Sequence, residues 1–282
     1  MNHADPIPQL TLHNGNQIPA LGFGTYSLNG HQGVDTMQRA LQHGYRMLDS
    51  AFNYENEGAV GQAVKLSGVP RDELFITSKL PGRHHRYEKA VVTIEESLYR
   101  AQLNYFDLYL IHWPNPQQGL YVEAWQALID AQKKGQIKSI GVSNFLPEHL
   151  EVLKKQTGVV PVVNQIELHP YFNQTEQHAY HQQHGILTMA WSPLGRGSDV
   201  FQDAVLNEIA QQLGKSVPQV ILRWQIQQGI IPIPKASSDA NQLANKAIFG
   251  FELSAEQMQK INGLTRQNGR LRNQDPASYE EF

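Results

Sequence analysis

The segments YFDLYLIH at 105–112 and IKSIGVSN at 137–144 indicate the fold most clearly. Each is a short apolar run rich in β-branched and aromatic residues, as in a strand that is buried on both faces. Between them, VEAWQALIDAQKKG at 122–135 has the apolar spacing of an amphipathic helix and ends on a glycine after two lysines. A strand, a helix and a second buried strand in succession predict parallel strands joined by a crossover.

Six further apolar runs repeat this unit along the chain. They are LGFGTY (21–26), YRMLDS (45–50), LFITSK (74–79), VVNQIE (162–167), ILTMAW (186–191) and IIPIPK (230–235). The last interval between strands is longer and holds two helical patterns, at 203–213 and 217–228. Eight strand–helix units predict an α/β protein with one (β/α)8 TIM-barrel domain over 1–282. A doubly wound sheet is disfavoured, because no Gly-x-Gly-x-x-Gly follows the first strand.

Three segments lie outside the repeat. LTLHNGNQIPA at 10–20 carries Asn14-Gly15 between extended stretches, which predicts an N-terminal β-hairpin with a type I′ turn that plugs the bottom of the barrel. SAEQMQKINGLTRQ at 254–267 predicts an extra C-terminal helix. The closing stretch at 268–282 is polar and irregular, and we expect it to pack over another part of the molecule.

Composition narrows the classes of function. Lysine and arginine number 23 and aspartate and glutamate 26, so the net charge of −3 gives no reason to expect nucleic acid or an anionic membrane as partner. The absence of cysteine excludes disulfides and thiolate chemistry. The opening MNHADPIPQL lacks the pattern of a secretory signal, and no apolar run reaches the ~18 residues of a membrane span. We therefore expect a cytoplasmic protein, and a monomer, since no long apolar surface stripe requires a partner.

His178, His181 and His184 stand three residues apart, a spacing that gathers side chains on one face of a helix. A metal site is one interpretation of this pattern. We favour a solvated helix face and no metal, because no carboxylate or fourth ligand is fixed nearby.

Polar residues stop most of the apolar runs, at the strand ends where such barrels place their chemistry. Asp49, Lys79 and His112 end three successive runs, and Tyr54 follows Asp49 on the adjoining loop. Each taken alone is explained as a solvated loop residue, a buried ion pair or a core histidine. Their convergence at one rim favours a shared chemical role.

These four side chains suit the protonation of an oxyanion that forms on a carbonyl. A tyrosine hydroxyl has an ordinary pKa of ~10, and a nearby ammonium lowers that pKa. A carboxylate keeps the ammonium charged and placed, and a neutral imidazole donates to the carbonyl oxygen. The set has no nucleophile paired with a base, so acyl transfer is disfavoured.

A second cluster follows the last strand. Lys235, Ser237 and Ser238 precede a helix that starts near Asp239, and together they predict an anion site for a phosphate-bearing hydride donor. The alternative is simple capping by Ser238 beside a solvated lysine. Trp191 offers a flat face for a ring, although a lone tryptophan is also common in a core.

Eight segments, GFGTY, LDSAFNYENEGAVG, FITSKL, DLYLIHWP, IGVSNF, NQIELHP, WSPLG and IPK, resemble in order and spacing the signature segments of the aldo-keto reductases. WPNPQQGLYVEAW and the polar end are most similar to the bacterial branch that includes the 2,5-diketo-D-gluconate reductases. The resemblance implies NADPH-dependent reduction of aldehydes and ketones. The implied substrates are small or hydroxylated carbonyls, such as keto sugar acids, 2-oxoaldehydes and keto esters.

The resemblance also implies roles for individual residues. The catalytic tetrad is Asp49, Tyr54, Lys79 and His112, with Tyr54 as proton donor. Cofactor contacts are implied for Gly24, Thr25, Ser143, Asn144, Gln165, Trp191, Ser192, Leu194, Lys235, Ser237, Asn241 and Asn245. Tyr26, Phe52 and Trp113 match positions that line the substrate pocket.

Two positions depart from the family pattern. Asn241 stands where many members have an arginine that grips the 2′-phosphate of the cofactor, so use of NADH remains open beside NADPH. Pro81 stands where many members have a tryptophan, and the basic run 83–86 follows it. We expect a pocket that is less aromatic and more polar on that side.

Two other functions remain open from the residues. A barrel lyase or aldolase would use Lys79 or Lys235 as a Schiff base. A non-catalytic nucleotide-binding subunit would keep the cofactor site without turnover.

Overall fold

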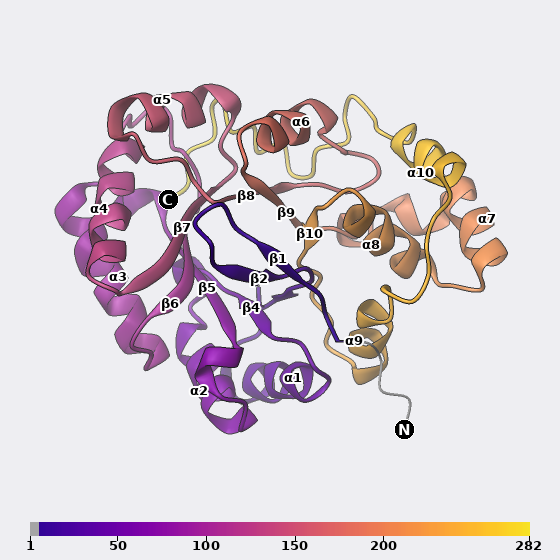
Figure 1. The fold of residues 1–282 in the computed structure, drawn as a ribbon, viewed down its shortest axis with the longest axis horizontal. Helices are drawn as coiled ribbons and strands as arrows, with labels where there is room; N and C mark the ends of the chain where they lie inside the picture. The colour runs from indigo at the N-terminus through magenta and orange to yellow at the C-terminus, as the bar shows by residue number, and fades with distance from the viewer. Residues whose placement is uncertain (1–5) are drawn as a thin grey trace.

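Eight parallel strands form one sheet in chain order in the computed structural model, which describes residues 6–282. They are β3 (Phe23–Gly24), β4 (Met47–Asp49), β5 (Phe75–Leu80), β6 (Phe106–Ile111), β7 (Ile137–Ser143), β8 (Val163–Glu167), β9 (Leu187–Trp191) and β10 (Ile231–Pro232). Each strand pairs with the next, and helices surround the sheet (Figure 1), so the predicted barrel architecture is confirmed. The first half of MNHADPIPQL, where no secretory signal is expected, lies outside the described residues.

Two backbone hydrogen bonds close the barrel between its first and last strands. Gly22 N–H donates to Pro232 O at 3.0 Å, and Gly24 N–H donates to Pro234 O at 3.1 Å. Neither proline has an N–H to donate in return, so this seam is held from one side only. β3 and β10 are consequently two residues long each, shorter than the runs that predict them.

The helices fill the intervals between the strands. They are α1 (Gly30–Gln42), α2 (Glu57–Ser67), α3 (Tyr87–Ala101), α4 (Tyr121–Lys133), α5 (Pro147–Thr157), α6 (Thr175–Gln183), α7 (Ala204–Leu213), α8 (Val217–Gln227), α9 (Asp239–Lys246) and α10 (Ala255–Asn262). α7 and α8 are the two helices predicted for the long interval, and α10 is the extra C-terminal helix. No helix in the described part of the chain is long and apolar enough to cross a membrane.

The predicted hairpin is confirmed as β1 (Gln9–Thr11) and β2 (Gln17–Pro19), and it crosses the end of the barrel in Figure 1. Leu12 and Ile18 are buried among side chains of the barrel interior, so the hairpin is the expected plug. The predicted turn type is wrong, because Gly15 has a positive φ of 88° and Asn14 does not. Leu12 N–H donates to Asn16 O at 2.9 Å, and the loop between them therefore has a third residue.

The histidines of α6 do not form a solvated face. His181 is fully buried, and the rings of His178 and His181 lie 2.8 and 2.9 Å from the Thr188 hydroxyl on β9. His184 stacks on Tyr180 instead. His178 and His181 therefore fasten α6 to the sheet, and residues 6–282 contain no group of three or more metal-ligating side chains that could hold an ion.

The contact between α2 and the end of α3 depends on a glycine. A Cβ on Gly61 would lie 1.8 Å from Ala101 O, whereas a Cβ on Gly58 would lie 3.4 Å from Arg100 O. We predict that Gly61→Ala lowers the melting temperature by roughly 5 °C or more, because backbone atoms have to move apart. Gly58→Ala, the matched control, leaves it unchanged or slightly higher. Equal melting curves for the two variants would contradict this packing account.

Candidate active site

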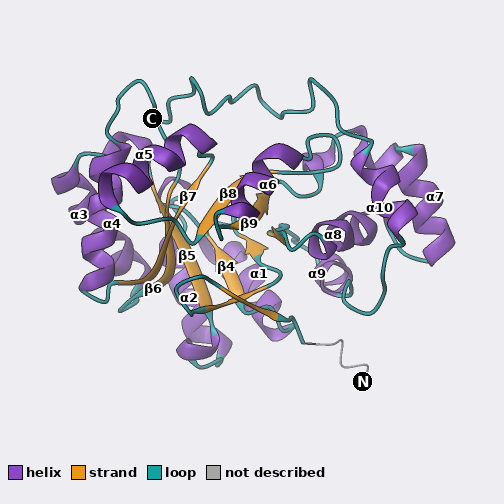
Figure 2. Ribbon diagram, turned by 45° about the horizontal axis from the view of Figure 1, so that its top comes forward, coloured by secondary structure: helices purple, strands orange, loops and turns teal. Residues whose placement is uncertain are grey.

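The carboxyl ends of the strands open into one cavity of about 750 Å³. Its floor carries residues from β3, β4 and β7–β9 together with His112 and Trp113 directly after β6, and its wall includes the segment after β10. Its roof comes from the closing stretch of the sequence, with Leu271, Arg272, Gln274, Tyr279, Glu281 and Phe282. Figure 2 shows the long loop after α10 crossing above the strands. The expectation that this stretch packs over another part of the molecule is confirmed.

A buried ion pair lies beneath the cavity. Lys79 Nζ on β5 is 2.5 Å from Asp49 Oδ1 on β4 and donates to Ser50 O at 2.7 Å. The second carboxylate oxygen of Asp49 accepts a hydrogen bond from Gln165 Nε2 at 2.8 Å. Both charged side chains are almost fully inaccessible. Because each charged side chain has several partners, the cost of burying the pair is offset.

Tyr54 lies beside this pair, at the end of a short 3₁₀ turn (Phe52–Tyr54), with Lys79 Nζ 5.2 Å from its ring centroid. Burial lowers the pKa of Lys79, but the charge of Asp49 and contacts with Tyr54 raise that pKa above its ordinary value. Burial raises the pKa of Tyr54, Lys79 lowers it, and the net direction is upward. The expected effect of Lys79 is present, but desolvation outweighs it, so Tyr54 is protonated at neutral pH.

His112 follows β6 and faces Tyr54, with ring centroids 5.9 Å apart. Its Nδ1 is 2.7 Å from Glu281 Oε1 but out of line for a hydrogen bond, so this contact is electrostatic. Asn144 links His112 to Trp191. Its Nδ2 donates to His112 O at 3.0 Å, and its Oδ1 accepts from Trp191 Nε1 at 2.8 Å. Asn144 has a positive φ of 63°, a conformation that asparagine tolerates better than most residues.

Most of the residues expected at the site lie around the cavity. Asp49, Tyr54 and His112 line it, while Lys79 is buried behind them. The expected cofactor residues on its surface are Gly24, Thr25, Ser143, Asn144, Gln165, Trp191, Ser192, Leu194 and Lys235, and the expected substrate residues are Tyr26 and Trp113. Four expected residues do not line it: Ser237, Asn241, Asn245 and Phe52.

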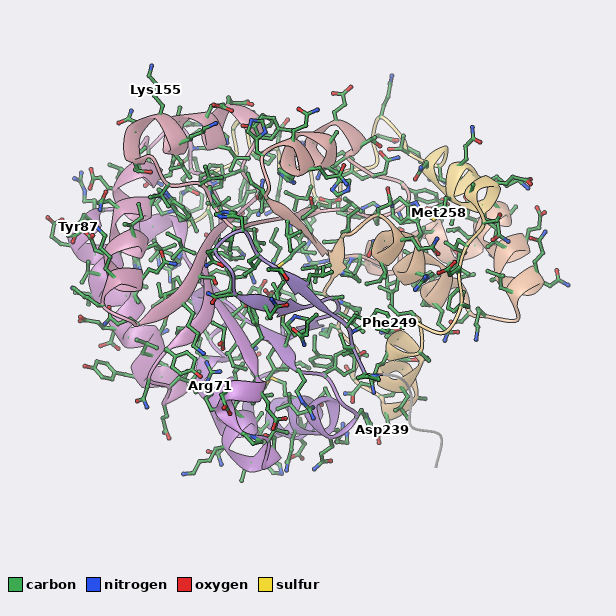
Figure 3. The ribbon with its side chains drawn as sticks, viewed as in Figure 1. Arg71, Tyr87, Lys155, Asp239, Phe249 and Met258 are labelled. Carbon is green, nitrogen blue, oxygen red and sulfur yellow. The ribbon has the colours of Figure 1, made fainter. Side chains whose placement is uncertain are left out.

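The cluster after β10 has an additional basic residue. Lys235 is exposed at the rim and donates to Ser27 Oγ at 2.8 Å. Arg39 on α1 pairs with Asp239 at 2.8 Å, and Asp239 begins α9 (Figure 3). Ser238 caps α9 by accepting the Asn241 N–H, so the cap of the alternative interpretation is present. An arginine therefore lies beside this cluster, although it comes from α1 and not from position 241.

The sequence did not point to Glu281 and Asn53, which line the cavity on the side where Pro81 predicts a polar wall. The basic run 83–86 does not line it. Instead, Gly82 N–H donates to Glu281 Oε2 at 2.9 Å, and Arg83 donates to Asn53 Oδ1. The run anchors the polar wall and is not part of it. The only signal for Glu281 was a pair of adjacent carboxylates in a polar tail.

Comparisons with known proteins identify the family of this chain. The model of the Aldo/keto reductase family matches residues 20–266. The 2,5-diketo-D-gluconic acid reductase B of Corynebacterium sp. is 48% identical over 98% of this chain and 99% of its own length. The glyoxal reductase of Bacillus subtilis is 45% identical over 90% of this chain and 92% of its own. A solved mutant of Gox0644 in complex with NADPH has a TM-score of 0.93 and 39% identity, covering 98% of this chain and 100% of that one. This chain belongs to the aldo/keto reductase family.

Proposed function

We propose that this protein reduces aldehydes and ketones to alcohols with NADPH, and that Tyr54 donates the proton. The observation that carries the proposal is the convergence of Asp49, Tyr54 and His112 on one cavity with Lys79 directly behind them. A relative that acts on 2,5-diketo-D-gluconic acid and another that acts on glyoxal support a small carbonyl substrate.

The residues around the cavity fit a nicotinamide dinucleotide, which supplies a hydride when it is bound. Trp191 is half-buried and lines the cavity, so its indole is available for a ring to stack on. Asn144 and Gln165 bring side-chain amides to the same wall. Lys235 stands exposed at the rim, where an ammonium suits the 2′-phosphate. The solved relative with NADPH bound supports this choice of cofactor.

Within this proposal the four tetrad residues have separate tasks. Tyr54 holds the proton, since its raised pKa keeps the hydroxyl protonated. The Lys79 ammonium stabilises the phenolate left behind after transfer, and Asp49 holds that ammonium in place. His112 orients the carbonyl oxygen.

The two alternative functions have less support. A Schiff base needs a neutral amine, but Lys79 is an ion-paired ammonium with a raised pKa and does not reach the cavity surface. Lys235 lies at the exposed rim and donates to Ser27, where the solvated ammonium form of its amine is favoured. A purely nucleotide-binding role leaves the buried Asp49–Lys79 pair beneath Tyr54 without a purpose.

The proposal also covers the class of substrate, the oligomeric state and the cellular location of the protein. Asn53, Arg272, Gln274 and Glu281 give the cavity polar walls, which suit small or hydroxylated carbonyls such as keto sugars, 2-oxoaldehydes and keto esters. We include in the proposal a single domain over 1–282, a monomeric state and a cytoplasmic location. Gel filtration and cell fractionation test the last two directly.

We predict that Tyr54→Phe lowers kcat for carbonyl reduction by about 10²-fold or more, because the proton donor is lost while the ring and its contacts remain. The dissociation constant for NADPH, measured by fluorescence titration, stays within about twofold. Tyr99→Phe, on an exposed ring of α3, is the matched control with unchanged kcat. Undiminished turnover by Tyr54→Phe would refute the role of Tyr54.

We predict that Lys235→Gln raises the KM for NADPH by roughly tenfold, because one charged contact to the 2′-phosphate is lost. The KM for NADH, which has no 2′-phosphate, changes little. Lys65→Gln, an exposed lysine on α2, controls for the general loss of one positive charge. If the two cofactors are affected equally, Lys235 does not bind the phosphate.

A further inference from the structure

Glu281 places a buried carboxylate in the wall of the cavity. Its Oε1 accepts from Asn53 Nδ2 at 2.8 Å and lies 2.7 Å from His112 Nδ1, while Oε2 accepts from Gly82 N–H at 2.9 Å. The residue is 7% exposed. The carboxylate thus touches the segment that carries Tyr54, the loop after β5 and the histidine after β6.

The backbone around Glu281 is fixed as well. Asn115 Nδ2 donates to Glu281 O at 2.8 Å, and Glu281 N–H donates to Asn115 Oδ1 at 3.1 Å. Arg83 donates to Phe282 O at 3.0 Å, and the Tyr279 ring packs on Trp113 with centroids 4.5 Å apart. The position of the carboxylate is therefore determined by the fold, unlike that of a mobile surface glutamate.

The negative charge of Glu281 is not neutralised by a lysine or arginine. Among residues 6–282 its only ion pair is with His112, whereas Asp49, the other carboxylate of the cavity, is paired with Lys79. Burial raises the pKa of Glu281, but His112, Gly82 N–H and Asn53 lower it below its ordinary value. Glu281 is consequently ionised at neutral pH.

We propose that Glu281 determines specificity by excluding substrates that carry a negative charge next to the reacting carbonyl. This inference rests on the proposed function, in which His112 contacts the carbonyl oxygen. A carboxylate on the adjacent carbon would lie a few ångströms from the Glu281 carboxylate, in a partly desolvated cavity where like charges repel strongly.

Glu281 disfavours an anion next to the carbonyl whether the His112 ring is neutral or protonated. If the ring is neutral, Glu281 is the main unpaired charge at the carbonyl end, because Asp49 is paired with Lys79 and Arg196 shifts the pKa of Tyr54 less than Glu281 does. If the ring is protonated, Glu281 cancels the cation that would attract an anion. Arg272, on the roof of the cavity, also lines it, so a carboxylate remote from the carbonyl is not excluded. The preferred substrates are therefore neutral at the reacting end: 2-oxoaldehydes, keto esters and keto acids with a distant carboxylate.

The test compares methyl pyruvate with pyruvate, which share the ketone and differ in the neighbouring charge. Glu281→Gln keeps an oxygen acceptor for Gly82 N–H and removes the charge. Glu280→Gln is the matched control: it removes one charge from the same segment, and Glu280 accepts Gln117 N–H at 2.7 Å outside the cavity lining. We expect the ester-to-acid ratio of kcat/KM to fall about tenfold or more in Glu281→Gln. The ratio stays at the wild-type value in Glu280→Gln.

A wild-type enzyme that reduces methyl pyruvate, with the same ratio in Glu281→Gln, would overturn the inference and leave the proposed function intact. If the wild type reduces neither pyruvate compound and none of a panel of aldehydes, that result would count against the proposed function itself. Should Glu281→Gln not fold, the wild type is measured on 2-oxo and 5-oxo acids and their methyl esters, and each ester-to-acid ratio is divided by the ratio of the same compounds' rates with borohydride, because a neighbouring carboxylate also lowers the intrinsic reactivity of a ketone. We expect strong discrimination for the 2-oxo pair and little for the 5-oxo pair, and equal discrimination would overturn the inference.

Discussion

The ion pair between Asp49 and Lys79 is the contact on which the site depends. It joins β4 to β5, and the free oxygen of Asp49 reaches across the barrel to Gln165 on β8. The backbone carbonyl of Asp49 also accepts the Thr25 hydroxyl after β3 at 2.9 Å. One buried residue thus connects four strands at their carboxyl ends. Loss of either charge would leave the other buried without its partner, at a cost of about 3–5 kcal/mol.

The C-terminal segment places a second constraint on the cavity. The segment from Arg270 to Phe282 returns over the strand ends and holds the cavity closed on one side (Figure 2). Glu167 helps to place it, since its carboxylate accepts Leu271 N–H at 2.6 Å and contacts His169 at 3.0 Å. In the proposed function, the barrel carries the proton donor and the charged residues beside it, while this segment adds Glu281 and other polar groups to the cavity wall.

The sequence predicted the parts of the structure that follow from local pattern. β5, β6 and most of β7 are buried on both faces, which is why they read as continuous apolar runs. Asp49, Tyr54, Lys79 and His112 could be singled out because each stands at or near a strand end, and the family resemblance implied their catalytic roles. The lengths of β3 and β10, the strands that close the barrel, were overestimated. Pro232 and Pro234 stand in an apolar run typical of a strand but cannot donate backbone hydrogen bonds. Arg39 and Glu281 were missed because their partners are distant in the chain and no periodicity connects them.

The most direct measurement of the central claim is a double-mutant cycle on kcat/KM with Asp49→Asn, Lys79→Met and the double variant. If Asp49 acts by holding the Lys79 ammonium beside Tyr54, each single change lowers kcat/KM by about a hundredfold or more. The double variant is then no slower than Lys79→Met alone, since Asp49 has nothing left to position. Losses that multiply in the double variant would contradict the account, because they would mean that Asp49 and Lys79 act independently.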